Sequence, residues 1–486
     1  MNRALMLAGF LALVICQPLL ANTAEKSKPY NVLFIAADDL RCDLACYGHP
    51  HVKTPHLDRL ANRGMLFQKA YCAQALCNPS RSSLLTGRRP ETLQQFNLTK
   101  HFRDQLPDVV TLPQHFKQNG YHTQGIGKLY HNWVTETHGD PISWSVPAVY
   151  HYATHGSDKA KVEGPLPKNF ASDPKCECRD VPDDAYFDGR IAKLAILALQ
   201  ERAKADTPFF LGVGFWKPHS PFNAPKKYWD YYERDSIPLA EDAFWPEGTD
   251  RIAWHNGREL LGAKKQRHLT ENAQREIRHG YLAAISYLDA QVGLLLDELD
   301  KLQLTDRTII VFWSDHGYHL GEHTLWAKTS NFEYDARVPM MIAMPSQEQY
   351  QTGACEAVVE LLDLYPTLVD LCGLPASEGL EGVSLKPLLK GEQSAAKPVA
   401  LTQHPRPAYY RDGKIDAMGY SVRSSDYRYT EWREPKTNRL LATELYDHQS
   451  DPGETKNRSS ESSLQQVIQW HQSELLKLVP KLRETP

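Results

Sequence analysis

Three continuous apolar runs, each ending in polar or charged residues, constrain the fold of this chain more than any other feature. The runs are YNVLFIAADDL at residues 30–40, FFLGVGFWKPH at 209–219 and TIIVFWSDHG at 308–317. Strands that are buried on both faces have this form, and they occur in parallel sheets covered by helices. Ligands of open α/β sheets bind beyond the carboxyl ends of the strands. We therefore expect the polar residues that end the three runs to build one site together.

Helical segments lie between these runs, so strands alternate with helices along the chain. Residues 184–205 and 361–371 are predicted to be helices, the second of which ends before Gly373 and Pro375. Thr270 is suited to cap a longer helix. The buried face of that helix is predicted from apolar residues at helical spacing, which are Ile277, Tyr281, Ile285, Leu288, Val292, Leu295 and Leu299.

A small, polar stretch, GEQSAAK at 391–397, predicts a boundary between two domains. Alternating runs follow it, such as YSVRSSDYRYTEWR at 420–433, and these predict antiparallel strands. A final helix is predicted near 463–477. The sequence thus predicts a large α/β domain over residues 28–392 and a smaller α+β subdomain over residues 393–486.

The first 24 residues have the layout of a secretory signal peptide. A basic start at Arg3 precedes an apolar run from Ala4 to Cys16, and small residues follow at Ala21 and Ala24. The alternative is a membrane anchor, but the apolar run is shorter than the roughly 20 residues that span a bilayer. No other segment approaches ~18 apolar residues. We expect an exported protein, periplasmic or secreted, without stable membrane insertion.

Composition excludes several classes of protein. Hydrophobic residues make up 42% and charged residues 23% of the 486-residue chain, which is typical of a globular enzyme with a sizeable core. The net charge of −4 argues against electrostatic binding to nucleic acid. Eight cysteines remain after Cys16 of the predicted signal peptide, and their spacing does not match a zinc site. If Cys77 has a role of its own, at least one other thiol should be free.

Acidic residues end two of the three apolar runs and are candidate metal ligands. Asp38 and Asp39 follow the first run, while Asp315 and His316 follow the third. Solvated turns or helix caps are the alternative, because Asp is common there. Three converging carboxylates would repel one another without a cation, and oxygen-rich sites suit calcium or magnesium.

The segment CNPSRSSLLTGRRP at 77–90 resembles the signature of type I sulfatases. In that family the Cys of Cys-x-Pro-x-Arg is converted to formylglycine by a dedicated maturation enzyme. The matching positions in this chain are Cys77, Pro79, Ser80, Arg81, Leu85, Thr86 and Gly87. The resemblance implies an alkaline-phosphatase-like sulfatase fold: a large, mixed and mostly parallel sheet flanked by helices, then a smaller C-terminal α+β subdomain with an antiparallel sheet.

The resemblance extends over most of the chain, from residue 30 to about 457, and its segments keep the family's order. They are GKLYH at 127–131, KPHSPF at 217–222, WAK at 326–328 and LYDHQSDPGETKN at 445–457. KPHSPF, GKLYH and the Asp315–His316 pair are most similar to the iduronate-2-sulfatase subgroup. Tyr318 stands where that subgroup has Trp, so the sugar contacted there is left open.

The family's chemistry implies a role for each matched residue. Hydrated formylglycine at position 77 would attack sulfur, form a sulfate ester and release sulfate by collapsing to the aldehyde. A divalent cation, calcium in preference to magnesium, would be held by this residue together with Asp38, Asp39, Asp315 and His316. Arg81, four residues from Cys77 and on the same helix face, would fix the nucleophile and the anion. The remaining predicted catalytic residues are Lys128 for sulfate, His131 as a base, and His219 and Lys328 at the bridging oxygen, one of them as the acid.

Several further basic residues have no clear place in this scheme. Arg88 and Arg89 fit either a substrate carboxylate or the end of a helix. His101, His122 and His404 have no assigned role and are expected to be ordinary surface or core residues.

The sequence therefore predicts an exported sulfatase that acts on a sulfated carbohydrate, in an exo manner on glycan fragments, after a maturation enzyme has modified Cys77. A phosphonate monoester or phosphodiester hydrolase of the same superfamily is the nearer alternative. The remote alternative is a non-catalytic protein that binds sulfated glycan. That alternative predicts loss of key residues, whereas Cys77, Arg81 and each expected metal ligand are present.

Overall fold

The computed structural model describes residues 29–131, 139–149, 176–261, 269–345, 349–409 and 414–483. The predicted signal peptide over residues 1–24 lies outside them. Among the helices of the described residues, none combines the length and the apolar character needed to cross a membrane.

A seven-stranded sheet forms the centre of the large domain, with the order β11-β2-β10-β7-β1-β5-β3. The three apolar runs form its middle, since β1 (Asn31–Asp38) lies between β5 (Phe209–Pro218) and β7 (Thr308–Ser314) and is parallel to both. Parallel pairs also join β3 (His122–Gly127) to β5 and β11 (Gly353–Glu360) to β2 (Met65–Tyr71). Only β10 (Arg337–Ala343) runs antiparallel to its neighbours in this sheet. The sheet is mixed and mostly parallel, as predicted.

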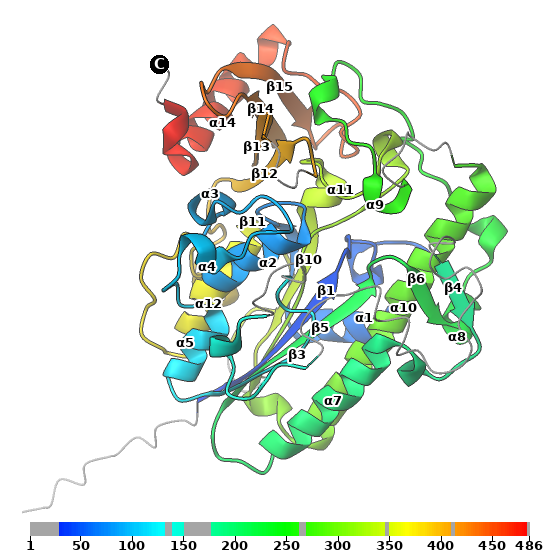
Figure 1. Cartoon of the computed structure of the whole chain (residues 1–486), viewed down its shortest axis with the longest axis vertical. Helices are drawn as coiled ribbons and strands as arrows, with labels where there is room; N and C mark the ends of the chain where they lie inside the picture. Colours follow the sequence, from blue (N-terminus) through cyan, green and yellow to red (C-terminus); the bar gives the residue numbers. More distant parts are fainter. Residues whose placement is uncertain are drawn as a thin grey trace, which may run out of the picture.

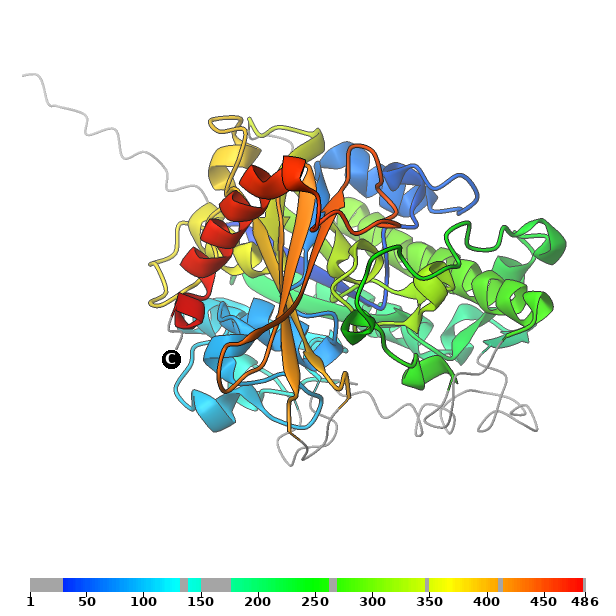
Figure 2. The same cartoon turned by 90° about the horizontal axis from the view of Figure 1, so that it is seen from above.

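Helices cover both faces of the sheet (Figures 1 and 2). One layer contains α1 (Pro55–Arg63), α7 (Phe187–Arg202) and α10 (Glu271–Lys301). The other layer contains α2 (Cys77–Thr86), α5 (Leu112–Gln118) and α12 (Leu364–Leu371). This arrangement explains why the strands are apolar throughout their length.

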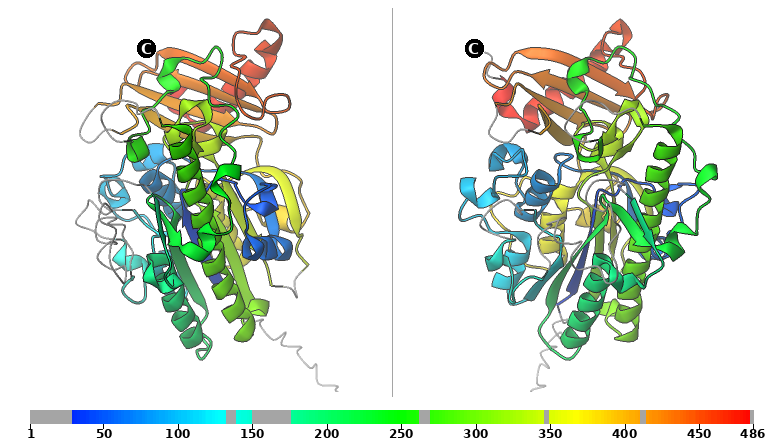
Figure 3. Two further views of the ribbon diagram at one scale, coloured as in Figure 1. Left: turned by 90° about the vertical axis from the view of Figure 1, so that its right-hand side faces the viewer. Right: turned by 45° about the vertical axis from the view of Figure 1, so that its right-hand side comes forward.

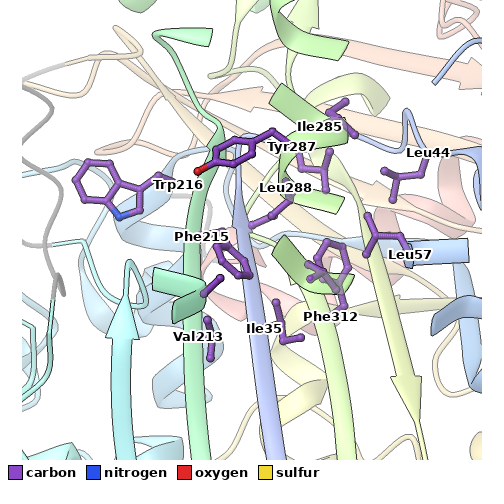
Figure 4. Packing of buried hydrophobic residues seen from close by; sticks show 14 of the residues in the cluster. Ile35, Leu44, Leu57, Val213, Phe215, Trp216, Ile285, Tyr287, Leu288 and Phe312 are labelled. Carbon is purple, nitrogen blue, oxygen red and sulfur yellow. The ribbon is translucent and has the colours of Figure 1, made fainter. Parts of the chain in front are cut away.

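Side chains of β1 alternate between two hydrophobic cores. Ile35 faces the core that contains α1 and α10, and Phe34 faces the opposite core. Figure 4 shows Ile35 and Phe312 of the sheet close to Leu57 of α1 and Leu288 of α10. Burial on both faces leaves only the ends of these strands for polar side chains.

The predicted helices form with small changes at their starts. Thr270 caps α10 as expected, because its Oγ1 accepts a hydrogen bond from the Ala273 N–H at 3.3 Å. The helix expected from residue 184 begins at Phe187, after a 3-10 turn over Asp183–Ala185. The helix expected from residue 361 likewise begins with a 3-10 turn over Leu361–Asp363 before α12.

An antiparallel sheet with the order β12-β13-β14-β15 follows in the C-terminal part. Its strands are β12 (Ala400–Arg406), β13 (Ala417–Arg423), β14 (Tyr427–Arg433) and β15 (Leu440–Asp447), and α14 (Gln465–Leu478) packs against it. This sheet lies beyond the carboxyl end of β1 (Figures 1 and 3). The Gln403 N–H donates to the Ala73 carbonyl at 2.9 Å across the two parts. The domain boundary at residue 392 remains a prediction.

Candidate active site

Residues from the ends of the three central strands meet in one buried cluster. Asp38 ends β1, Asp315 and His316 follow β7, and His219 follows β5. Register places Ala37 of β1 opposite Ser314 of β7 and Asp38 opposite Pro218 of β5, which brings the three ends level. The predicted convergence of these strand ends is therefore present in the fold.

Cys77 lies at the start of α2 and points into this cluster. Its Sγ is 3.3 Å from Nε2 of His316, and the ligand atoms of Cys77, Asp38, Asp315 and His316 all lie within 4.8 Å of one another. Nδ1 of His316 is 3.0 Å from the Gly317 carbonyl, a contact that fixes the proton on Nδ1 and leaves the Nε2 lone pair toward the cluster.

The donor set suits a divalent cation. Asp38 and Asp315 converge with the His316 imidazole, and Asp39 adds a third carboxylate, since its Oδ1 lies 3.4 Å from His316 Nε2. Oxygen-rich sets of this kind suit hard divalent cations. Asp39 adopts a left-handed backbone conformation with φ of 64°, and its N–H donates to Asp315 Oδ1 at 3.1 Å. This local turn explains how two consecutive acids at a strand end serve one site, although neighbours within a strand point to opposite faces.

Three buried cations balance the three carboxylates. Lys128 pairs with Asp38, Arg81 Nε lies 2.8 Å from Asp315 Oδ2, and Lys328 Nζ lies 2.7 Å from Asp39 Oδ1. Burial raises the pKa of Asp38, but Lys128, His219 and Arg81 outweigh burial and hold that pKa well below its usual range.

The two adjacent acids differ in their proton affinity. Burial holds the pKa of Asp39 well above its usual range, and the Lys328 charge offsets this only in part. A divalent cation bound between the carboxylates would favour the ionised form of both.

Arg81 ties α2 to three strand ends and is completely buried. Besides Asp315, it donates to Asp38 Oδ1 at 3.3 Å and to the Ala37 carbonyl at 3.0 Å. It also donates to the carbonyls of Lys128 and Leu129. In this arrangement Arg81 orients the acids and holds positive charge beside Cys77.

Lys128 reaches the cluster because β3 ends in a glycine. Gly127 has a φ of 84°, and a Cβ there would lie 2.0 Å from the Gly214 carbonyl oxygen. Glycine therefore permits the close approach in which the Lys128 N–H donates to that same carbonyl at 2.7 Å. His131 is buried nearby, and burial together with the Lys128 charge holds its pKa well below the usual value. A neutral His131 is able to accept a proton.

His219 and Lys328 both lie close to Asp39. His219 Nδ1 lies 2.7 Å from the Ser220 carbonyl, which directs Nε2 toward Asp39 Oδ2 at 3.7 Å. Lys328 follows β9 (Trp326–Ala327) and lies between two residues with positive φ, Ala327 at 71° and Thr329 at 93°. Such backbone strain in non-glycine residues persists where the surrounding structure fixes a side chain in place.

Two residues near this cluster were not predicted from the sequence. Glu259 on α9 (Arg258–Leu261) lies 2.8 Å from Lys328 Nζ and 3.6 Å from His219 Nε2. Tyr409 follows β12, and Glu259, Lys328 and Cys77 all act on its pKa, which burial holds well above the usual value. Neither residue lies in a segment with a recognisable motif, so no sequence signal marked them.

Other basic residues have structural partners. Arg89 forms a two-point ion pair with Glu360 at 2.7 and 2.9 Å, and Arg88 donates to the Glu378 carbonyl at 2.7 Å. These contacts favour a structural role over binding of a substrate carboxylate. His404 is completely buried, and His101 caps the short helix α4 (Phe102–Gln105).

Tyr318 is a core residue. Its side chain is completely buried and stacks on Tyr281, with ring centroids 5.8 Å apart. Among the described cysteines all eight are free thiols, which includes the free thiol expected beyond Cys77.

Comparisons with known proteins relate the chain to one family. The family model described as "Sulfatase" matches residues 30–374, and the one described as "N-sulphoglucosamine sulphohydrolase, C-terminal" matches residues 321–481. Iduronate 2-sulfatase of Homo sapiens is 35% identical over an alignment that covers 95% of this chain and 97% of that protein.

Solved structures share the fold. A phosphonate monoester hydrolase of Agrobacterium radiobacter superposes with a TM-score of 0.74 at 22% identity, covering 93% of this chain and 96% of that one. A structure solved in complex with its substrate D-glucosamine-2-N,6-O-disulfate gives a TM-score of 0.73 at 22% identity, covering 94% and 98%. At this level of identity the two structures support the alkaline-phosphatase-like sulfatase fold alone.

Proposed function

Because this chain belongs to the sulfatase family and is a sulfuric ester hydrolase, we propose that it releases sulfate from a sulfated carbohydrate. The observation that carries this proposal is the position of Cys77. The residue starts α2 beside carboxylates from the ends of β1 and β7 and beside three buried cations, Arg81, Lys128 and Lys328. A negatively charged ester and a nucleophile would meet there, away from bulk water.

The proposed cation ligands are Asp38, Asp39, Asp315 and His316, with the modified residue 77 completing the set. A bound divalent cation, calcium in preference to magnesium, would supply Lewis-acid activation of the nucleophile and charge for the sulfate oxygens. The oxygen-rich donor set, with a single imidazole and a single sulfur, supports a hard cation.

Conversion of Cys77 to formylglycine by a maturation enzyme is part of the proposal. Its support is the complete motif around Cys77 and the family to which the chain belongs. Hydrated formylglycine would supply the nucleophilic oxygen. Burial raises the pKa of the encoded Cys77 thiol to about 12, so an unmodified residue would hold its proton near neutral pH and would be a weak nucleophile.

The remaining polar side chains would bind the sulfate group and transfer protons. The ammonium groups of Lys128 and Lys328 would attract the sulfate oxygens, and Arg81 would hold Asp38 and Asp315 in place. Neutral His131 would accept a proton at residue 77. His219 or Lys328 would give a proton to the leaving sugar oxygen, because both flank Asp39 on one side of the cluster.

We further propose an exported, exo-acting enzyme on sulfated glycan fragments, similar to iduronate 2-sulfatases. The signal-peptide pattern over residues 1–24 supports export. The identity of 35% to iduronate 2-sulfatase over most of both chains supports a glycan substrate. Sulfate release from a panel of sulfated disaccharides would identify the sugar.

A phosphonate monoester hydrolase is the second candidate, because such enzymes share the fold. The relatives of 35% identity are sulfatases, whereas the phosphonate hydrolases are 22% identical, so sulfate is favoured.

The test is sulfate release by protein co-expressed with a maturation enzyme. The substrates are a 2-O-sulfated uronate disaccharide, its positional isomers, and a matched pair of aryl sulfate and aryl phosphonate. Release from the 2-O-sulfated uronate alone would support the resemblance to iduronate 2-sulfatases. Release from another sugar alone would retain the sulfatase chemistry and reject that substrate. Faster turnover of the phosphonate than of the matched sulfate would overturn the preference for sulfate.

A further inference from the structure

A small cavity adjoins the cluster around Cys77 and is lined by residues without a part in the proposed chemistry. Its volume is about 210 Å³, and its lining includes His255, Arg258, Arg406 and Tyr409. The first two come from the segment around α9, and the other two from the end of β12 and the residues that follow it. The cavity therefore lies where the large domain meets the C-terminal sheet, a region seen in Figure 3.

His255 lines this cavity and carries an unused hydrogen-bond donor. Its Nδ1 accepts the Gly257 N–H at 3.2 Å, so the proton of the neutral ring is on Nε2. Nε2 is buried and has no partner among the described residues, and the side chain is only 5% exposed. Burial and the Arg406 charge hold the pKa of His255 well below its usual value, which keeps the ring neutral. Buried polar atoms without a partner are rare in proteins, and a bound ligand is one explanation.

Arg406 places a buried positive charge against the same cavity. Its guanidinium donates to main-chain carbonyls, namely Ile252 at 2.8 Å and Thr329 at 3.1 Å, and stacks on Trp432. Within the described part of the chain it forms no ion pair with a carboxylate. Burial lowers the pKa of Arg406 to about 10, so it remains charged at neutral pH. The charges of Glu444 and Asp335 offset the burial of Arg406 only in part, and an anion in the cavity would stabilise the guanidinium further.

Tyr409 connects the cavity to the catalytic cluster. Its Oη is buried and without a hydrogen-bond partner among the described residues, and it lies close enough to Lys328 for the charge of that ammonium group to act on it. Arg258 adds a second guanidinium, and the adjacent Glu259 is turned toward Lys328. The described lining residues include two arginines and no carboxylate.

We propose that this cavity is a subsite for an anionic substituent of the substrate, a carboxylate or a second sulfate on the sugar beside the scissile ester. The inference rests on the proposed function, and it assigns substrate selection to His255, Arg258, Arg406 and Tyr409. An acceptor-only anion matches the unused donors of His255 and Tyr409 and the two guanidinium groups in the lining, whereas a neutral hydroxyl would satisfy only the donors. A volume of about 210 Å³ suits one substituent and part of a sugar ring rather than a whole disaccharide.

The test measures binding in a Cys77→Ala background, in which the substrate is not consumed. Calorimetry would give Kd for three ligands: a 2-O-sulfated uronate disaccharide, its carboxyl-reduced analogue, and that analogue with a second sulfate. Arg258→Gln is the main variant because Arg258 is exposed and its loss should not affect folding. Arg251→Gln is the matched control, an exposed arginine that stacks on Trp245 outside the cavity. Tyr409→Phe removes only the phenolic oxygen and tests whether the Tyr409 hydroxyl also contributes to binding.

We expect Arg258→Gln to weaken binding about tenfold for a ligand that carries the recognised anion, and Arg251→Gln to change it less than about twofold. If Arg258→Gln weakens binding of the uronate alone, the cavity binds a carboxylate. If it weakens binding of the doubly sulfated analogue alone, the cavity binds a sulfate. Equal losses for all three ligands, or no loss for any, would overturn the subsite. Failure of the proposed function is seen separately, as the absence of sulfate release from a simple aryl sulfate by the mature wild-type enzyme.

Discussion

Glu259 Oε2 lies 2.8 Å from the Nζ of Lys328, and the same ammonium group lies 2.7 Å from Asp39 Oδ1. Burial lowers the pKa of Lys328, but Asp39, Cys77 and Glu259 outweigh burial and raise it well above its usual value. The Glu259 carboxylate therefore stabilises the charged form of Lys328, and we expect Glu259 to position that side chain for catalysis.

The first prediction concerns Glu259→Gln. We expect kcat/KM for a sulfated sugar to fall about tenfold or more, because Lys328 loses a partner that fixes its position and its proton. Loss of the carboxylate lowers the pKa of Lys328, so the alkaline limb of the pH–rate profile should move to lower pH. An aryl sulfate with a good leaving group needs less acid catalysis and should lose less activity. Glu241→Gln, at an exposed position, is the control. Equal losses on both substrates with an unmoved profile would mean that Glu259 is only structural.

Cys77→Ala should abolish turnover while leaving the fold intact. The expected loss of kcat is about a thousandfold or more, since the residue supplies the nucleophile in the proposed reaction. The side chain is small and buried, so the melting temperature should change little. Peptide mass spectrometry of the wild-type protein would report whether residue 77 is modified. Activity close to wild type in the variant would reject the mechanism.

Removal of the divalent cation should lower activity and stability together. A ligand that binds only the native state raises the melting temperature with its concentration. Exhaustive chelation should abolish sulfate release and lower the melting temperature, and calcium should restore both better than magnesium. Full activity after verified removal of metal would contradict the proposed site.

Asp315→Asn should lose metal and activity together. The change removes one charge from the proposed ligands and weakens the contact with Arg81 Nε, which lies 2.8 Å from Asp315 Oδ2. Because Arg81 is completely buried, we expect a stability loss of about 3 kcal/mol as well. Metal analysis and urea unfolding separate the two effects. The control is Asp235→Asn, which changes an exposed acid. Retention of one bound metal ion per protein by Asp315→Asn would count against Asp315 as a ligand.

Glu444 should make the protein less stable as pH rises. Burial raises its pKa to about 7, and hydrogen bonds from Trp432 and Tyr446 offset this only in part. Its folded-state pKa exceeds the unfolded value, so the folded protein binds the extra proton and stability falls between about pH 4.5 and pH 7. The contribution of this shift is about 3 kcal/mol. Glu444→Gln keeps the shape and should flatten this part of the urea-unfolding profile between pH 5 and 8. Parallel profiles for the two proteins would show that Glu444 does not titrate in this range.

Local sequence patterns predicted much of the fold. The apolar runs predicted strands buried on both faces, and the alternation of Phe34 and Ile35 between two cores confirms this. Thr270 was predicted to cap α10 from residue type and spacing alone. The helix starts near residues 184 and 361 were placed a few residues early, because the local chain first forms 3-10 turns that periodicity does not distinguish from α-helix.

Local periodicity and one short motif are enough to predict the strands with polar ends, the position of Cys77 and Arg81 on one helix face, and the family to which the chain belongs. Other contacts follow from the packing of distant segments: Glu259 contacts Lys328, Arg89 pairs with Glu360, and Tyr409 and Arg406 line one cavity with His255. These contacts join segments far apart in the chain, and no local pattern records them. They form only when helices, strands and the C-terminal sheet pack together, since packing sets which side chains share a buried volume and which charges must be balanced there.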